Sequence, residues 1–159
     1  IKKMAVGAND ANAPTAVLFG TVTSVDPLEI TVEQKLKFIN YDAYYDLGHV
    51  YFELGDYESA ISNFETVITY QENNELLYYA LAQAYEANNE IDKAISNYLK
   101  AIAVNDKFTL AYKKVGVLFL ARNDYEDAIE YFEDYLNFDI PQEEKDSVEK
   151  LVERIKAKL

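Results

Sequence analysis

The chain has 159 residues, half of them hydrophobic, and carries a formal net charge of -13. This length predicts one or two small domains, and so negative a chain repels phosphate backbones, which argues against nucleic acid as a partner. Because cysteine is absent, disulfides and thiolate metal sites are excluded, while the compartment stays open, with the cytoplasm favoured. The sequence contains no apolar run long enough to span a membrane.

The first 40 residues favour strands over helices. Residues 1–14 show weak helical character at most and then a linker of small residues. Residues 16–25 are rich in β-branched side chains, Asp26-Pro27 is typical of a turn, and apolar and polar residues alternate over 28–38. We therefore predict a β-hairpin with room for a third short strand. So few strands are marginally stable alone and need a partner surface.

From residue 41 the chain repeats itself. The stretch at 60–64 recurs at 94–98 and at 128–132, so the period is 34 residues. Upstream of each copy, an aromatic residue is followed at fixed spacing by an apolar residue, a Gly or Ala, and a second aromatic residue. A fixed period of this size predicts a repeat array, and the two apolar patterns in each copy predict two amphipathic helices.

Seven helices are expected in this region. We place the first six at 41–54, 57–70, 75–88, 91–104, 109–122 and 125–138. The seventh runs from 142 to 158, with one apolar stripe, acidic residues at its start and basic residues at its end. Because a repeat array needs a terminal element with one polar face, we expect this helix to cap the stack.

The recurring residues of 41–140 resemble the tetratricopeptide repeat family. The matching positions are Tyr44, Leu47, Gly48, Tyr51, Ala60 and Phe64, then Tyr78, Leu81, Ala82, Tyr85, Ala94 and Tyr98, then Tyr112, Val115, Gly116, Phe119, Ala128 and Phe132. Small residues such as Gly48 leave room for close helix approach, and the aromatic residues fill the space beside them. We expect the aromatic positions Tyr44, Tyr51, Phe64, Tyr78, Tyr85, Tyr98, Phe119 and Phe132 to form the core.

The resemblance implies an all-α fold in which three helix-turn-helix repeats form a right-handed superhelix. We assign repeats to 41–74, 75–108 and 109–141, a capping helix to 142–159, and a hairpin-like or irregular segment to 1–40. The proline that the family carries near the repeat end is replaced by Glu72 and Asp106 in the first two copies.

Residues 1–38 resemble a different family. The strings at 17–22 and 26–36 are similar to the start of small β-rich proteins encoded among prophage tail and baseplate genes. This resemblance implies a phage-tail-like context and a junction near residue 40 between two unrelated pieces. Natural fusion, truncation and an engineered chimera would each produce such a junction.

In the tetratricopeptide repeat family, the first helix of each repeat lines a concave groove that contacts ligands. The corresponding candidates here are Asp42, Tyr45, His49, Phe52, Glu53, Leu76, Tyr79, Gln83, Glu86, Leu110, Lys113, Val117 and Leu120. This aromatic and aliphatic groove with a mainly acidic rim suits a peptide or protein segment with apolar anchors flanked by Lys or Arg. The family's cationic clamp for a terminal carboxylate is not reproduced, because Tyr45 and His49 stand in its first positions.

Each candidate also has a structural interpretation. The groove candidates could be ordinary helix surface, because solvated helix faces carry similar mixtures of side chains. His49 is the only histidine, and no second metal ligand or nucleophile accompanies it in a recognisable pattern. The chain has no glycine-rich phosphate loop and no calcium-loop pattern. We therefore predict no enzyme, no cofactor and no metal.

Three functions follow from these patterns. The first is a non-catalytic scaffold whose groove binds a peptide or protein. The second is a self-assembly module in which residues 16–38 mediate oligomerisation or occupy the groove, since unpaired strand edges invite pairing. The third is an accessory domain of a hydrolase or transferase whose chemistry belongs to a partner. Of the three we favour the scaffold.

Overall fold

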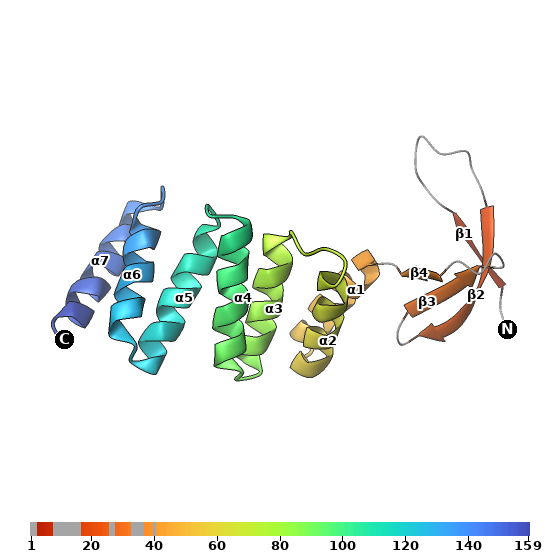
Figure 1. The fold of residues 1–159 in the computed structure, drawn as a ribbon, viewed down its shortest axis with the longest axis horizontal. Helices are drawn as coiled ribbons and strands as arrows, with labels where there is room; N and C mark the ends of the chain where they lie inside the picture. The colour runs from red at the N-terminus through yellow and green to blue at the C-terminus, as the bar shows by residue number, and fades with distance from the viewer. Residues whose placement is uncertain (1–2, 8–16, 26–27, 33–36, 40) are drawn as a thin grey trace. The chain divides into compact units, whose positions relative to one another are not determined.

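The computed structural model describes residues 3–7, 17–25, 28–32, 37–39 and 41–159. These residues form four strands and seven helices (Figure 1). The chain divides into two compact units, Ile1–Tyr44 and Tyr45–Leu159, which are described separately.

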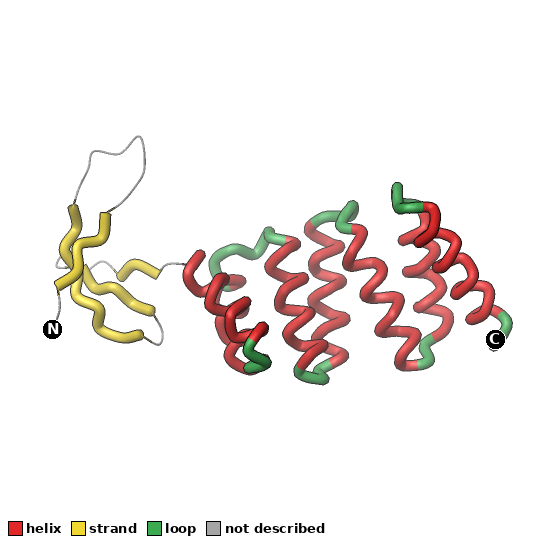
Figure 2. The backbone as a smooth tube through the Cα atoms, turned by 180° about the vertical axis from the view of Figure 1, so that it is seen from behind, coloured by secondary structure: helices red, strands yellow, loops and turns green. Residues whose placement is uncertain are grey.

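The strands of the first unit form one antiparallel sheet, drawn in yellow in Figure 2. They are β1 (Lys3–Gly7), β2 (Val17–Val25), β3 (Leu28–Val32) and β4 (Lys37–Ile39). Their order in the sheet is β1-β2-β3-β4. The longest strand, β2, pairs with β1 through its first half and with β3 through its second half.

The predicted hairpin is confirmed, and β4 is the third short strand. The register of β2 against β3 shifts between Val22 and Ser24, which is the mark of a β-bulge. The expectation of weak helix before residue 14 is wrong, because β1 pairs along its whole length with Val17–Thr21 of β2. Its Ala and Gly have little preference for strand, so pairing with a distant segment decides its structure. The predicted turn at 26–27 and Leu36 lie outside the described residues.

The seven predicted helices are confirmed. They are α1 (Tyr41–Glu53), α2 (Tyr57–Ile68), α3 (Glu75–Ala87), α4 (Ile91–Val104), α5 (Thr109–Arg122), α6 (Tyr125–Leu136) and α7 (Gln142–Lys156). Each begins at the predicted residue, and several end one or two residues early. Within the described ranges, every helix falls short of the length and apolarity needed to cross a bilayer.

The turn between the two helices of each repeat has the same geometry three times. A residue with left-handed backbone stands at equivalent positions, namely Gly55, Asn89 and Asn123 (φ 79°, 62° and 63°). In the first turn the Asp56 N–H donates to the Tyr51 carbonyl across 2.9 Å, as in a Schellman motif. The Asp56 carboxylate then accepts from the Ser59 N–H and caps α2.

The small residues of the repeat make room for an aromatic ring. A Cβ added to Gly48 would lie 2.6 Å from the ring of Phe64, and one added to Gly116 would lie 2.9 Å from the ring of Phe132. Ala82, at the equivalent position of the middle repeat, is fully buried. The predicted packing of a small residue on the first helix against an aromatic residue on the second is therefore confirmed.

Most of the predicted aromatic core is buried. The buried members are Tyr44, Phe64, Tyr85, Tyr98 and Phe132. Tyr51, Tyr78 and Phe119 are only half-buried, so for them the core prediction is wrong. Phe119 packs against the edge of the core cluster of α6 and α7 and stacks on the ring of Tyr131 with centroids 5.6 Å apart.

The last helix closes the stack as predicted for a cap. Val148, Val152 and Ile155 of α7 are buried in a cluster with Phe132 and Tyr135 of α6. The opposite face of α7 is charged and exposed. One apolar stripe therefore completes the core of the third repeat, while the other face meets water.

Candidate functional site

One ion pair joins the first helices of two successive repeats, and another joins a first helix to the capping helix. Lys114 of α5 pairs with Glu86 of α3 across 3.0 Å, and Lys113 of α5 pairs with Glu144 of α7 across 2.5 Å. The helices α3, α5 and α7 therefore lie beside one another along one side of the array. We call the surface formed by the predicted groove residues of α3, α5 and the part of α1 from Tyr45 onward the first-helix face.

Apolar side chains stand exposed on this face in register with the repeat. Leu76 and Leu110 occupy equivalent positions of α3 and α5 and are 55% and 54% exposed. Val117, two turns further along α5, is 43% exposed. A single exposed leucine is unremarkable, but here the exposure recurs at equivalent positions of two successive repeats.

In the first repeat the candidate rings pack against the core. Tyr45 and His49 meet edge to face with centroids 4.6 Å apart, and their rings lie 5.9 Å and 5.1 Å from that of Phe64. Burial, and then the charge of Asp46, raise the pKa of Tyr45. This end of the face therefore presents the rings of Tyr45 and His49.

In the middle repeat the candidate carboxylate already has partners. Glu86 accepts a hydrogen bond of 2.7 Å from the Tyr98 hydroxyl and pairs with Lys114. Burial of Tyr98, followed by this hydrogen bond, raises its pKa well above the ordinary range. Tyr79 packs between the rings of Tyr98 and Phe108, at 5.3 Å and 5.2 Å. Glu86 is thus an anchor between helices, and its charge is compensated.

The third repeat shows the same arrangement. Burial, followed by a hydrogen bond to Glu144, raises the pKa of Tyr135 to about 12. The hydrogen bond from Lys113, followed by that from Tyr135, lowers the pKa of Glu144. Lys113 and Glu144 therefore hold α5 and α7 together, and the charge of Lys113 is also compensated.

The remaining candidates differ in exposure. Phe52 is half-buried against the ring of Tyr57, with centroids 5.6 Å apart, and Leu120 packs against the α6–α7 core. Asp42 and Glu53 are exposed, and Gln83 is half-buried. Contact of these residues with a ligand stays a prediction.

The raised pKa of Tyr135 predicts a loss of stability in alkali. The unfolded chain releases the proton at the ordinary tyrosine pKa of about 10, while the folded chain keeps it until about pH 12. The contribution of Tyr135 is complete below pH 10, and between the two values it falls by at most about 1.4 kcal/mol per pH unit, in addition to what other tyrosines with raised pKa lose. Urea denaturation followed by circular dichroism from pH 9 to 12 measures this slope.

Tyr135→Phe is the matched control for this titration. It removes the titrating proton while keeping the ring, so the fall above pH 10 is expected to be shallower by about one proton equivalent. If the free energy of unfolding fell equally steeply with pH in the variant and in the natural chain, the loss of stability would come from groups other than Tyr135.

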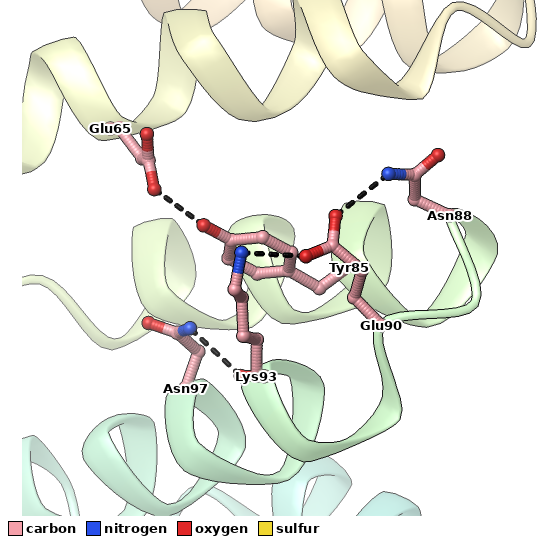
Figure 3. Close-up of polar contacts among 6 residues, drawn as sticks. All are labelled: Glu65, Tyr85, Asn88, Glu90, Lys93 and Asn97. Atoms are coloured by element: carbon pink, nitrogen blue, oxygen red, sulfur yellow. Dashed lines mark hydrogen bonds and ion pairs between the residues drawn. The ribbon is translucent and has the colours of Figure 1, made fainter.

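A polar cluster where α2, α3 and α4 meet was missed by sequence reasoning (Figure 3). The Tyr85 hydroxyl of α3 donates to Glu65 of α2. The ammonium of Lys93, on α4, lies 5.0 Å from the centre of the Tyr85 ring and pairs with Glu90 across 2.6 Å. The amide of Asn97 donates to the Lys93 carbonyl across 2.9 Å. Three helices therefore meet at this point.

The signal that could have found this cluster is a difference between repeats. Lys93 and Lys100 stand where the first repeat has Ser59 and Thr66 and where the third has Asp127 and Asp134. Packing requires the aromatic positions to recur, but it does not require these lysines. A comparison of charge between copies would therefore have singled them out.

The charged residues do not gather into a metal site in the part of the chain that the structure describes. No group of three or more His, Asp or Glu side chains there is arranged to hold a metal ion.

Two family models match the helical region. A model of the TPR repeat matches residues 48–89, and a model of the tetratricopeptide repeat matches residues 79–144. Residues 48–144 are therefore tetratricopeptide repeats, as predicted. The resemblance of residues 1–38 to phage-tail-associated proteins stays a prediction. No curated protein matches the chain.

Solved structures with the same fold support this assignment. The first TPR domain of Spaghetti (RPAP3), bound to HSP90 peptide SRMEEVD, is 24% identical with a TM-score of 0.59, over 70% of this chain and 92% of that one. The type III secretion chaperone SycD of Yersinia enterocolitica, in complex with a peptide of the translocator YopD, is 19% identical with a TM-score of 0.66, over 74% and 92%. The Sgt2 TPR domain of Aspergillus fumigatus is 22% identical with a TM-score of 0.60, over 74% and 78%. At these identities the likeness establishes the fold alone.

Proposed function

We propose that the first-helix face binds a segment of a partner protein through apolar side chains, and that this role is non-catalytic. The observation that carries the proposal is the exposure of Leu76 and Leu110 at equivalent positions of α3 and α5, with Val117 exposed two turns further along α5. Aliphatic side chains in register offer successive contacts to one bound segment. Burying them on binding removes apolar area from water.

The similar structures support the class of ligand. One was solved with an HSP90 peptide and another with a peptide of the translocator YopD. Both proteins share the fold of this chain, so a peptide is a ligand of suitable size. The clamp that grips a terminal carboxylate is not expected here, because Tyr45 and His49 stand in its first positions and their rings contact that of Phe64.

The charges on the face indicate the finer chemistry of the partner. Glu86 and Lys113 are engaged in ion pairs, whereas Glu53 is exposed. A segment that carries apolar anchors flanked by Lys or Arg would complement this balance. Rim charges of this kind affect association rate and salt dependence more than affinity.

The test is the double substitution Leu76→Ser with Leu110→Ser in the full chain. A peptide is first selected from a random 12-residue display library against the natural chain, and its affinity is then measured by isothermal titration calorimetry. We expect the double variant to bind it at least about 30-fold more weakly, which corresponds to about 2 kcal/mol. Both leucines are exposed, so thermal stability should hardly change.

Leu54→Ser is the matched control, because Leu54 is 74% exposed at the end of α1 and is not a groove candidate. It should bind the selected peptide as the natural chain does. Equal affinity of the double variant and the control variant would contradict the proposal.

A further inference from the structure

We propose that a hollow at the capped end of the array binds one carboxylate side chain of a partner segment whose neighbouring residues are basic. The hollow lies between the turn that joins α5 to α6 and the last turns of α7, at the lower end of the array in Figure 1. We call it the cap hollow. It includes Leu120 of the first-helix face but none of the three apolar residues on which the proposed function rests, so the two proposals are tested separately.

The floor of the cap hollow is the edge of the last core cluster. Leu120 of α5 and Leu151 and Ile155 of α7 line a cavity of about 270 Å³. Ile155 is buried, whereas Leu120 and Leu151 are partly buried against the cluster. Small-molecule sites begin at about 300 Å³, so the cavity has room for a single anchoring side chain. The methylene groups of a glutamate would gain from contact with such an apolar floor.

The wall of the cap hollow carries two cations and no carboxylate. Arg154 and Lys158 line the cavity, and both side chains are exposed. Among the described residues neither belongs to an ion pair. The lining therefore has two positive charges, one from each side chain, that no group within it compensates. The complement of such a lining is an anion.

Two polar residues add to this wall. The Lys158 ammonium lies 5.5 Å from the centre of the Tyr125 ring, and the Tyr125 hydroxyl donates to the side-chain oxygen of Asn123 across 2.9 Å. This bond engages the oxygen of the Asn123 amide, so its N–H groups remain as donors. A guanidinium, an ammonium and an amide thus line one small cavity. A carboxylate, which only accepts hydrogen bonds, suits all three.

The charges along α7 favour the same ligand. Lys150, Arg154 and Lys158 follow one another at intervals of four residues, a spacing that places side chains along one face of a helix. Like charges at this spacing destabilise a helix. A carboxylate bound between Arg154 and Lys158 would reduce their repulsion.

Carboxylates next to the cap hollow limit the ligand to one negative charge. Asp124 pairs with Arg122 across 2.9 Å. With Asp124, the side chains of Glu126 and Asp127 line a second hollow of about 270 Å³, which adjoins the cap hollow at Tyr125. Glu126 and Asp127 take part in no ion pair of the described residues. A basic residue beside the bound carboxylate would therefore meet two unpaired carboxylates.

The net charge of the chain, -13, leads to the same restriction. At physiological ionic strength charges more than about 8 Å away are largely screened, so the lining decides which group enters the cap hollow. A segment with several carboxylates would still be repelled by the second hollow and by the chain as a whole. A phosphate group, with nearly two negative charges at neutral pH, is disfavoured for the same reason.

The probe is an acetylated and amidated heptapeptide, Gly-Lys-Ala-Glu-Ala-Lys-Gly, titrated into the ¹⁵N-labelled full chain. We expect amide shift changes in the turn between α5 and α6 and in the last two turns of α7. The heptapeptide with Gln in place of Glu should bind about 5-fold more weakly, the effect of one exposed ion pair. Because the Gln peptide is the more positive of the two, non-specific attraction to an acidic chain would give the opposite order.

A third peptide tests the limit to one carboxylate. Replacing both Lys of the heptapeptide by Glu should weaken binding at least about 5-fold. The added carboxylates would approach Glu126 and Asp127, whereas the lysines that they replace would pair with them.

Substitutions separate the cap hollow from other surfaces. Arg154→Glu should weaken binding of the Glu heptapeptide about 10-fold, because it replaces attraction with repulsion. Lys107→Glu makes the same change of net charge at an exposed position beyond the other end of α5 and should leave affinity within about 2-fold. Leu76→Ser with Leu110→Ser should leave it unchanged. Both charge variants replace exposed residues, so their thermal stability should match that of the natural chain.

Four results would overturn the cap hollow. Equal or tighter binding of the Gln heptapeptide would remove the role of the carboxylate, and tighter binding of the peptide with three Glu would contradict the limit to one. Equal effects of Arg154→Glu and Lys107→Glu would remove the role of position. Shift changes confined to other surfaces, or none up to about 5 mM peptide, a concentration above the millimolar affinity of such a contact, would remove the site itself.

Discussion

Replacing Phe132 by alanine is expected to lower the free energy of unfolding by about 3–5 kcal/mol, the range found for large aromatic residues in protein cores. Phe132 is 1% exposed, and its ring fills the space that Gly116 leaves open. It also belongs to the cluster that joins α6 to α7. Alanine would leave a cavity bounded on two sides by helices that cannot easily close on it.

Urea denaturation of the full chain, followed by circular dichroism at 222 nm, measures this loss. Leu54→Ala is the control, because Leu54 is 74% exposed and its removal should change stability by no more than about 0.5 kcal/mol. Similar values for Phe132→Ala and Leu54→Ala would contradict the packing between the two helices of the third repeat.

The second large effect concerns the cap. Ile155→Asp is expected to detach α7, since Ile155 is 2% exposed and an unpaired carboxylate at a buried position costs several kcal/mol. Because each element of such an array contacts only its neighbours, the damage should stay at the C-terminal end. Amide hydrogen exchange should lose its protection in α7 and weaken in α6, while α3 and α4 keep theirs.

Lys150→Asp provides the comparison on the same helix. Lys150 is exposed, so the same carboxylate there should leave exchange protection of α7 almost unchanged. If Ile155→Asp instead raised exchange evenly from α2 to α7, the array would unfold as one unit, and the local role of the cap would be wrong.

The helical fold could be predicted because its signals recur. Each packing position appears three times at the same spacing, so a weak local preference in one copy is reinforced by the others. The left-handed residues of the turns show this well, since one glycine and two asparagines, Gly55, Asn89 and Asn123, share one position. A residue type that tolerates positive φ was sufficient at each.

The first unit could be predicted less well, for a physical reason. Strand β1 has little intrinsic preference for its conformation and acquires it by pairing with Val17–Thr21. Pairing between segments that are distant in sequence is invisible to local patterns. The role of residues 16–38 in self-assembly stays a prediction.

The candidate site, too, could be predicted from the sequence only in part. Exposure of Leu76 and Leu110 agrees with their assigned face, because a repeat position fixes the direction of a side chain. The compensation of Glu86 by Lys114 and of Lys113 by Glu144 could not be predicted, since each pair joins residues about one repeat apart through space. For this reason the face is less charged than its sequence indicates.

The most direct test of the scaffold is a map of intermolecular nuclear Overhauser effects between the full chain and the peptide selected from the random library. Methyl protons of Leu76, Leu110 and Val117 are expected to show contacts with apolar side chains of the peptide, in an order that follows the repeats. Contacts confined to other surfaces, with these three methyl signals unchanged at saturation, would contradict binding at the first-helix face.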